Sequence, residues 1–193
     1  MRIGVLAVQG AFAEHISRLA LLGTEGFEIR QRKDLSAPFD GLILPGGEST
    51  AMRRLLKELD LLVPLKTMIQ NGLPVFGTCA GMILLAKEIS GGEAPCFGTL
   101  DITVRRNAYG RQLGSFRCRE QFAGSEIEMP FIRAPYAERV GENVTVLAQH
   151  ENRIIAVREG SQLAAAFHPE LTDDTAVCKY FLQMVAKSPL NVV

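Results

Sequence analysis

The sequence predicts an α/β protein with three layers, in which a mostly parallel open sheet carries helices on both faces. Three observations support this prediction. Short apolar runs of the kind found in strands covered on both sides alternate with stretches of helical periodicity. The joints between these segments are short, and they are rich in glycine. Such alternation is typical of parallel sheets, because each crossover between parallel strands places a helix on one face.

The elements of the first half follow in order from this alternation. Strands are predicted where the apolar runs are continuous, and helices where apolar residues recur every three or four positions. The expected strands are residues 3–8, 27–30, 41–44 and 74–76, and the expected helices are residues 11–22, 52–59 and 82–89.

The pattern changes beyond Gly91-Gly92 to short alternating segments separated by turns. Residues 144–149 and 154–157 are predicted to form a hairpin, and residues 163–167 a final apolar strand. An apolar stripe from Thr175 onward predicts a C-terminal helix. The sequence shows no repeats, linker or low-complexity tract, so we expect residues 1–193 to form a single domain.

The charge balance argues against nucleic-acid and membrane partners. The 193 residues contain 21 Lys plus Arg and 21 Asp plus Glu, without the clustered basic charge that such partners require. The first apolar run is too short for a signal peptide and is expected to be a buried strand. The cysteines show no CxxC spacing, which predicts reduced thiols in a cytoplasmic protein. They are Cys79, Cys96, Cys118 and Cys178.

The segment Gly77-Thr78-Cys79-Ala80-Gly81 lies between a predicted strand and a predicted helix. It has the G-x-C-x-G form of a nucleophile elbow, in which glycines prevent backbone collisions in a sharp turn. A helix start favours a thiolate, and its N–H groups, that of Ala80 first, can bind an oxyanion. The alternative is a buried structural cysteine, but both glycines and the strand-to-helix context favour catalysis.

Among the three histidines, His168 is the best placed to act as a base for that thiol. It follows an apolar strand, and Glu170 lies two residues further on, beyond Pro169. Residues two apart in an extended segment point the same way, so this carboxylate can orient the imidazole. On its own, the segment could equally be a strand end with a solvated acid. We expect His15 to be a satisfied or surface residue of the first helix, and His150 to be a solvent-exposed turn residue.

The loop at residues 45–50 (PGGEST) also follows a predicted strand. Ligands of open parallel sheets bind outside the carboxyl ends of the strands, so this loop is expected to share a cleft with the cysteine elbow. Its two glycines could aim N–H groups at a ligand and complete an oxyanion hole with Ala80. They could also simply form a turn, with Ser49 capping the next helix. Arg106 and Arg133 are candidates for clamping a carboxylate, with a surface role as the alternative.

Together these segments resemble the class I, triad-type glutamine amidotransferases. The similarity is closest to the glutaminase subunits of pyridoxal 5′-phosphate synthase complexes, and it covers essentially the whole chain. The segments that carry it are IGVLAVQGAFAEH, LILPGGESTAMRRL, FGTCAGMILLAKEI, RRNAYGRQ, FIRAP and FHPEL. The resemblance implies the flavodoxin-like fold of class I glutamine amidotransferases.

The resemblance implies a role for each candidate residue in hydrolysing L-glutamine to L-glutamate and ammonia, without a metal or other cofactor. Cys79 would be the nucleophile, His168 the general base and acid, and Glu170 the residue that orients His168. The implied substrate-binding residues are Gly47, Glu48, Ser49, Arg106, Ile132 and Arg133. The implied oxyanion donors are the backbone N–H groups of Gly47 and Ala80.

The resemblance also implies a protein partner, the pyridoxal 5′-phosphate synthase subunit, in a hetero-oligomeric complex. This subunit would receive the ammonia and use it with a pentose phosphate and a triose phosphate. We expect the docking face to lie around Gln9, Gly10 and His15. The sequence departs from the family pattern at Gly114, where an acidic residue is common, so the polar contacts of that loop are expected to differ.

Other interpretations stay open from the sequence. The chain could be the glutaminase subunit of another amidotransferase, such as imidazole glycerol phosphate synthase. It could also be a DJ-1-type cysteine-elbow protein that acts as a redox sensor or chaperone. That class has no dedicated His-x-Glu at the final strand, so the HPEL segment argues against it. An intact triad likewise argues against a catalytically silent binding subunit.

Overall fold

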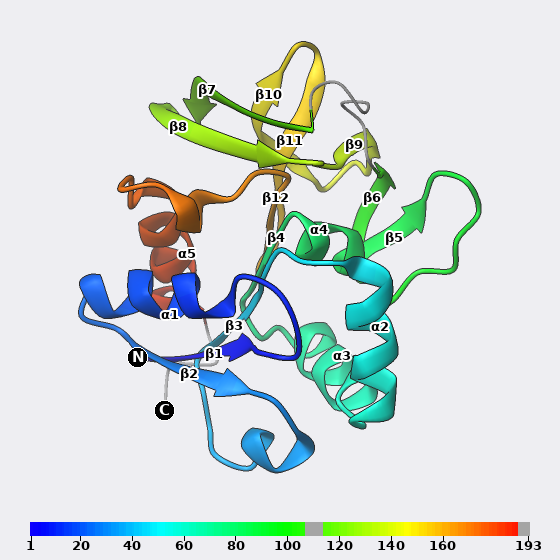
Figure 1. Ribbon diagram of the computed structural model, residues 1–193, viewed down its shortest axis with the longest axis vertical. Coiled ribbons are helices and arrows are strands. Elements are labelled where there is room, and N and C mark those ends of the chain that lie inside the picture. The colour runs from blue at the N-terminus through cyan, green and yellow to red at the C-terminus, as the bar shows by residue number, and fades with distance from the viewer. Residues whose placement is uncertain (107–113, 189–193) are drawn as a thin grey trace.

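A computed structural model describes residues 1–106 and 114–188 of the chain (Figure 1). The strands are β1 (Arg2–Leu6), β2 (Glu25–Ile29), β3 (Gly41–Leu44), β4 (Val75–Thr78), β5 (Ala86–Ile89), β6 (Leu100–Arg105), β7 (Ser115–Phe122), β8 (Ser125–Ile132), β9 (Tyr136–Val140), β10 (Thr145–His150), β11 (Arg153–Glu159) and β12 (Gln162–Ala165). The α-helices are α1 (Phe12–Leu21), α2 (Ser49–Glu58), α3 (Leu62–Gln70), α4 (Ala80–Leu85) and α5 (Ala176–Ala186). Two short 3₁₀ helices are η1 (Arg32–Leu35) and η2 (Pro169–Leu171).

The strands form a ten-stranded sheet and a separate two-stranded sheet. The order of the large sheet is β2-β1-β3-β4-β12-β11-β9-β6-β5, and β10 pairs with β11 beside this path. The first five strands in this order, β2, β1, β3, β4 and β12, are all parallel to one another. Beyond β12 the pairing becomes antiparallel, except that β5 and β6 are parallel. The antiparallel pair β7-β8 lies outside the large sheet.

Helices cover both sides of the parallel strands, as predicted. In Figure 1, α1 and α5 lie on one side and α2, α3 and α4 on the other. Phe76 of β4 packs against Phe181 of α5, with ring centroids 5.7 Å apart. Buried apolar side chains of the parallel and antiparallel halves, such as Leu44 and Ile155, belong to one continuous core. The sequence therefore predicted the architecture correctly, because the doubly covered strands are apolar throughout.

The predicted helix over residues 82–89 is wrong beyond Leu85. Helix α4 ends there, and residues 86–89 form β5, which pairs in parallel with β6. Lys87 forms an ion pair with Asp101, and Glu88 accepts a hydrogen bond from Thr103. These residue types favour a helix locally, but pairing with a neighbouring strand outweighs that preference.

Helix α3 is an element that the sequence interpretation left unassigned. Its signal is an apolar residue at every fourth position, Leu61, Leu65 and Ile69, and all three are buried. The hairpin predicted over residues 144–157 is confirmed as β10 and β11. The final strand is shorter than predicted, because β12 ends at Ala165.

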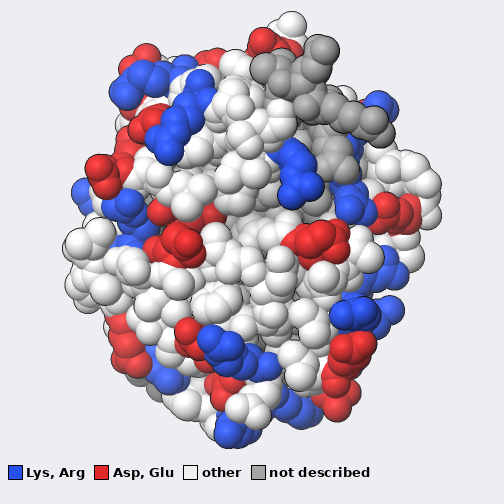
Figure 2. All heavy atoms as spheres, in the orientation of Figure 1, with Lys and Arg blue, Asp and Glu red and all other residues white. Residues whose placement is uncertain are grey.

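Charged side chains are distributed over the surface in both signs. On the face shown in Figure 2, the described basic and acidic side chains are intermixed. Several form ion pairs across neighbouring elements, such as Arg2 with Glu25 at 2.9 Å and Arg117 with Glu128 at 2.6 Å. Within the described residues, none of the helices is both long and apolar enough to cross a membrane.

The elbow between β4 and α4 requires glycine for steric reasons. A Cβ at Gly81 would lie 2.1 Å from the carbonyl oxygen of Leu44, and a Cβ at Gly77 would lie 2.6 Å from the carbonyl carbon of Gly81. Both contacts are with backbone atoms, which cannot rotate away. The two glycines of the G-x-C-x-G segment therefore lie where β3, β4 and α4 come too close together to leave room for a side chain.

We predict that Gly81→Ala lowers the free energy of unfolding by roughly 1–3 kcal/mol or more, the usual cost of overpacking. The added methyl group would force the elbow away from β3. Denaturant unfolding monitored by circular dichroism would measure the change. Gly114→Ala is the matched control, because no heavy atom of the described residues lies within 4 Å of a Cβ at that position. Equal stability of the two variants would contradict this packing argument.

Candidate active site

Four loops meet at the carboxyl edge of the parallel strands, after β1, β3, β4 and β12. They surround a cavity of about 400 Å³, a size that suits an amino acid. The predicted site residues that line it are Gly47, Glu48, Ser49, Cys79, Arg106, Ile132, Arg133 and His168. The sequence interpretation missed two other lining residues, Ala11 and Ile83. Residues far apart in sequence thus face one cavity, as expected for the end of a parallel sheet.

Cys79 occupies the strained turn of a nucleophile elbow. Its φ of 47° and ψ of −100° lie in a region that non-glycine residues rarely adopt. Its N–H donates to the carbonyl of Ala165 at 2.8 Å, which ties the turn to the end of β12. Its thiol, which is buried, donates to the carbonyl of Ile132 with Sγ and O 3.9 Å apart. The turn therefore holds the sulfur at the cavity wall.

His168 and Glu170 form the predicted pair, although not in an extended segment. Nδ1 of His168 lies 2.7 Å from Oε1 of Glu170, and both residues are buried. The 3₁₀ turn η2 brings them together, because it starts directly after His168. The N–H of His168 donates to the carbonyl of Pro130 at 2.9 Å, so β8 fixes the backbone of this histidine.

The surroundings of His168 stabilise its protonated form. Burial acts to lower its pKa, but interactions with the Cys79 and Glu170 side chains outweigh burial and raise the pKa to about 10. The pKa of Glu170 is lowered: its burial acts to raise it, but the flanking His15 and His168 more than compensate. The site therefore favours an imidazolium beside Cys79 at neutral pH, backed by a carboxylate.

His15 lies behind this pair and is a part of the site that the sequence interpretation did not find. Its Nε2 is 3.2 Å from Oγ1 of Thr78 and 3.5 Å from Oε2 of Glu170. No hydrogen-bond partner of that Oε2 atom is found within the described residues, so His15 is the polar group that faces it. Burial lowers the pKa of His15, although the charge of Glu170 acts to raise it. The sequence signal was weak, because only the fold brings α1 against η2.

The same contacts correct two expectations about histidines. His15 is 4% exposed, so it cannot belong to a docking face. The expected docking residues Gln9 and Gly10 do reach the cavity. His150 is half-buried at the end of β10, and its Nδ1 lies 2.8 Å from Oε1 of Glu120, so it is not the solvent-exposed turn residue that we expected.

The loop after β3 is held by the loop after β1. The carbonyl of Gly46 accepts a hydrogen bond from Ala11 at 3.0 Å, and the N–H of Glu48 donates to the side chain of Gln9 at 2.8 Å. A Cβ at Gly46 would lie 2.3 Å from Cε1 of His168, so the loop backbone packs directly on the imidazole. A movement of the Gly46–Gly47 loop toward the imidazole would therefore displace His168.

Glu48, rather than Ser49, caps helix α2. Its carboxylate accepts hydrogen bonds from the N–H groups of Thr50 at 3.0 Å and Ala51 at 2.7 Å. These two bonds, the first above all, together with nearby Arg106, lower the pKa of Glu48. Ser49 is the first residue of the helix, and it is buried. The expectation that Ser49 is the cap is therefore wrong, because the longer Glu48 side chain reaches back to the orphan amides.

The two candidate arginines differ in what they already bind. Nη1 of Arg106 lies 2.8 Å and 2.7 Å from the two carboxylate oxygens of Glu93, and its Nη2 lies 3.6 Å from Glu48. Arg133 has a left-handed φ of 44°, and its backbone N–H donates to the carbonyl of Gly114. The Arg133 side chain has no ion pair with a described residue, so it is the cation at the cavity that is available to a ligand. The neighbouring segment, residues 107–113, lies outside the described residues.

Comparison with known protein families places the whole site in context. Residues 5–187 match the SNO glutamine amidotransferase family. The chain belongs to this family. The resemblance predicted from the GTCAG, PGGEST and HPEL segments is thereby confirmed.

Individual relatives of this family cover nearly the same length. The chain is 59% identical over 187 residues to the "Pyridoxal 5'-phosphate synthase subunit PdxT" of Methanocorpusculum labreanum, covering 96% of this chain and 98% of the relative. It is 51% identical over 188 residues to the protein of the same name from Streptococcus pneumoniae, covering 95% and 97%. A protein of this name from Haemophilus influenzae is 52% identical, covering 95% and 98%.

Solved structures support the fold of the amidotransferase family. One described as "Crystal structure of glutamine amidotransferase" superposes with a TM-score of 0.90 at 43% identity, covering 95% of this chain and 98% of the other. Another, described as "Structure of PurLQS from Thermotoga maritima", has a TM-score of 0.67 at 16% identity, covering 99% and 98%. The second likeness concerns the fold alone.

We predict that Glu170→Gln lowers the pKa of His168 from about 10 by on the order of 1 unit or more, because the variant removes the adjacent negative charge. A pH titration of the His168 ring signals by NMR would measure it. The wild-type imidazole should stay protonated through neutral pH, and the variant should begin to lose its proton at lower pH. Glu120→Gln is the matched control, because it removes a carboxylate from His150 instead. A His168 titration that is the same in all three proteins would contradict the assignment.

Proposed function

We propose that the protein is the glutaminase subunit of a pyridoxal 5′-phosphate synthase. It hydrolyses the side-chain amide of L-glutamine to L-glutamate and passes the ammonia to a synthase subunit. The observation that carries this proposal is that Cys79 and His168 line the same cavity, with Glu170 hydrogen-bonded behind the imidazole. This arrangement is a Cys-His-Glu triad.

The proposed reaction begins with the Cys79 proton already on His168, as a thiolate beside an imidazolium, and the sulfur attacks the amide carbon. The oxyanion that forms is held by the N–H groups of Gly47 and Ala80. Ala80 is the first residue of α4, so its N–H has no acceptor within the helix. Gly47 lines the cavity. Preorganised donors of this kind typically contribute roughly 10²–10³ in rate each.

His168 then donates its proton to the departing nitrogen, and ammonia leaves as the C–N bond breaks. The product on the enzyme is a γ-glutamyl thioester of Cys79. A water molecule, deprotonated by His168, attacks this thioester, and L-glutamate is released with the thiol restored. Glu170 stabilises the imidazolium in both halves of the reaction, because its carboxylate accepts a hydrogen bond from Nδ1–H.

The walls of the cavity supply charges that complement the ends of glutamine. We assign the substrate carboxylate to the Arg133 guanidinium and the substrate ammonium to the Glu48 carboxylate, with Ser49 beside them. Arg106 supports this arrangement by its contacts with Glu48 and Glu93. Ile132 contributes an apolar surface for the methylene groups.

The synthase subunit is proposed to dock near the exposed Gly10 and half-buried Gln9. Gln9 and the adjacent Ala11 hold the Gly46–Glu48 loop by hydrogen bonds, so a partner that binds there would act directly on the oxyanion donors. Docking also has a chemical reason, because ammonia released into water would be protonated and lost as a nucleophile. A thiol nucleophile needs reducing conditions, which supports a cytoplasmic location.

The rival interpretations are disfavoured by particular observations. A DJ-1-type redox or chaperone function does not account for the buried His168–Glu170 pair behind the cysteine. The glutaminase of imidazole glycerol phosphate synthase would share the triad. The full-length relatives at 51–59% identity, all named as subunits of pyridoxal 5′-phosphate synthase, favour the proposed complex.

We predict that Cys79→Ala reduces ammonia release from glutamine by roughly 10⁴-fold or more, because the covalent route is lost. The fold should be retained, since alanine fits the same turn. Coupled detection of glutamate, in the presence of the synthase subunit, would measure the rate. Cys178→Ser is the control, because Cys178 lies on α5 away from the cavity. Turnover by the Cys79→Ala protein at the wild-type rate would refute the mechanism.

We also predict that the pyridoxal 5′-phosphate synthase subunit raises the glutaminase rate. A gain of up to roughly 10²–10³-fold is expected if docking completes one oxyanion donor. Steady-state ammonia release with increasing amounts of the synthase subunit would measure it. The cyclase subunit of imidazole glycerol phosphate synthase, added in its place, should have no effect. Stimulation by the cyclase alone would favour the rival complex.

A further inference from the structure

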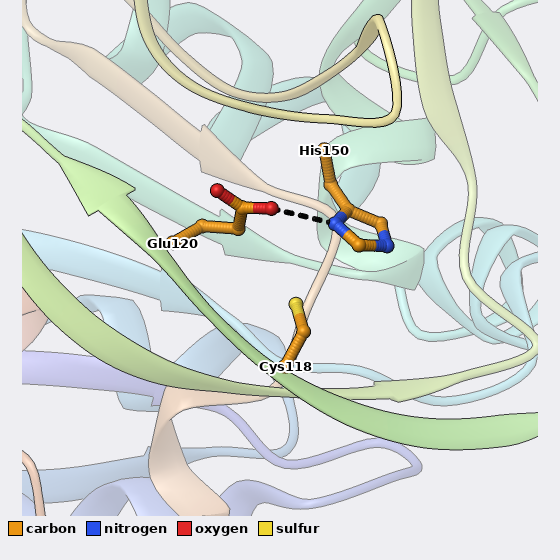
Figure 3. A group of neighbouring side chains, drawn as sticks. All are labelled: Cys118, Glu120 and His150. Carbon is orange, nitrogen blue, oxygen red and sulfur yellow. Dashed lines mark hydrogen bonds and ion pairs between the residues drawn. The ribbon is translucent and has the colours of Figure 1, made fainter.

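A second group of reactive side chains lies outside the active-site cavity, where the β7-β8 hairpin meets β10. Cys118 and Glu120 come from β7, and His150 is the last residue of β10 (Figure 3). One potential ligand atom of each residue lies within 4.8 Å of those of the other two. Figure 3 shows the three side chains pointing toward one another. None of them takes part in the proposed hydrolysis of glutamine.

The strand geometry explains why these side chains meet. Along β7, residues alternate between exposed and half-buried, and Cys118 and Glu120 are two apart on the half-buried side. This side faces β10, as the 2.8 Å separation between Oε1 of Glu120 and Nδ1 of His150 shows. The His150 ring lies beside Phe116, with centroids 5.5 Å apart, which fixes its position.

We infer that Cys118, Glu120 and His150 form a zinc-binding site that links the β7-β8 hairpin to the large sheet. A thiolate, an imidazole and a carboxylate are the three ligand types that zinc takes from proteins. Three protein ligands leave the fourth tetrahedral position to water.

The spacing of the ligand atoms suits such an ion. Zinc bonds of about 2.0–2.3 Å place tetrahedral ligand atoms roughly 3.3–3.8 Å apart. The present separations, all within 4.8 Å, require only small side-chain adjustments to reach this range. The hydrogen bond of 2.8 Å between His150 and Glu120 would be replaced by two bonds to the metal.

The local charge also favours a cation. The carboxylates of Glu120 and Glu151 are near enough to the Cys118 thiol to act on it electrostatically. The same two carboxylates would attract a divalent ion, which displaces the thiol proton when it binds. The basic residues Arg117 and Arg119 project from the opposite side of β7 and pair with Glu128 and Glu126.

The position of the site connects it to the active-site cavity. Strand β8 pairs with β7 along its whole length, and it ends at Ile132 beside Arg133. Its Pro130 carbonyl also accepts the hydrogen bond from the N–H of His168. An ion that clamps β7 to β10 would therefore steady the strand that supports one wall of the cavity.

Titration with Co²⁺, a spectroscopic probe for zinc sites, tests this inference. The experiment uses the full-length Cys79→Ala protein, so that the active-site thiol is not a ligand and the result is independent of the proposed function. One Co²⁺ per chain should bind with a thiolate-to-metal charge-transfer band, and Zn²⁺ should displace it. Cys118→Ser in this background should abolish the band, and His150→Gln should weaken binding by roughly 100-fold, the share of one ligand in a zinc site.

Matched variants provide the controls. Cys178→Ser removes another half-buried thiol and should leave the band unchanged. Glu120→Gln should weaken binding, whereas Glu126→Gln, an exposed carboxylate on β8, should not. A charge-transfer band that survives Cys118→Ser, or the lack of such a band in the starting protein, would overturn the inference. Because Ser differs from Cys by one atom, circular dichroism should show an unchanged fold in Cys118→Ser.

Discussion

One backbone hydrogen bond underlies the active site, namely the bond from the N–H of Cys79 to the carbonyl of Ala165. It joins the turn that carries the proposed nucleophile to the end of β12, just before the proposed base, His168. This hydrogen bond continues the parallel pairing of β4 and β12, because Thr78, the residue before Cys79, lies opposite Ala165. Glycines at positions 77 and 81 let α4 pack closely against β3 and β4, since any Cβ there would meet backbone atoms. Catalytic geometry in this protein is therefore a consequence of strand pairing.

Behind this junction, the Glu170 carboxylate contacts two histidines, His168 and His15. Glu170 binds His168 through Oε1 and faces His15 through Oε2, although it is buried away from water. A buried charge is costly unless it is compensated, so the site depends on both contacts. His15 also contacts Thr78, the residue before the nucleophile. Helix α1 is thus connected to both ends of the triad through a single imidazole.

The antiparallel half of the sheet contributes to the site from a distance. Strand β8 supplies the carbonyl groups of Pro130 and Ile132, which contact His168 and Cys79. The two-stranded sheet that contains β8 is separate from the large sheet, and the backbone hydrogen bond from Ala123 to Leu147 joins it to β10. The Cys118, Glu120 and His150 group lies at this contact. Metal binding there would add a link between β7 and β10, two strands that belong to different sheets.

The chemistry and the parallel half of the fold could be predicted from the amino-acid pattern alone. Cys79, His168 and the glycine loop follow apolar strands, and parallel strands place their carboxyl ends at one edge. Contacts between distant elements fixed the remaining features. Residues 86–89 favour a helix but pair with β6, and Glu48 rather than Ser49 reaches the helix amides. Local pattern could not show that His15 is buried against Glu170, because that contact joins elements near opposite ends of the chain, and only the packing of α1 on η2 creates it.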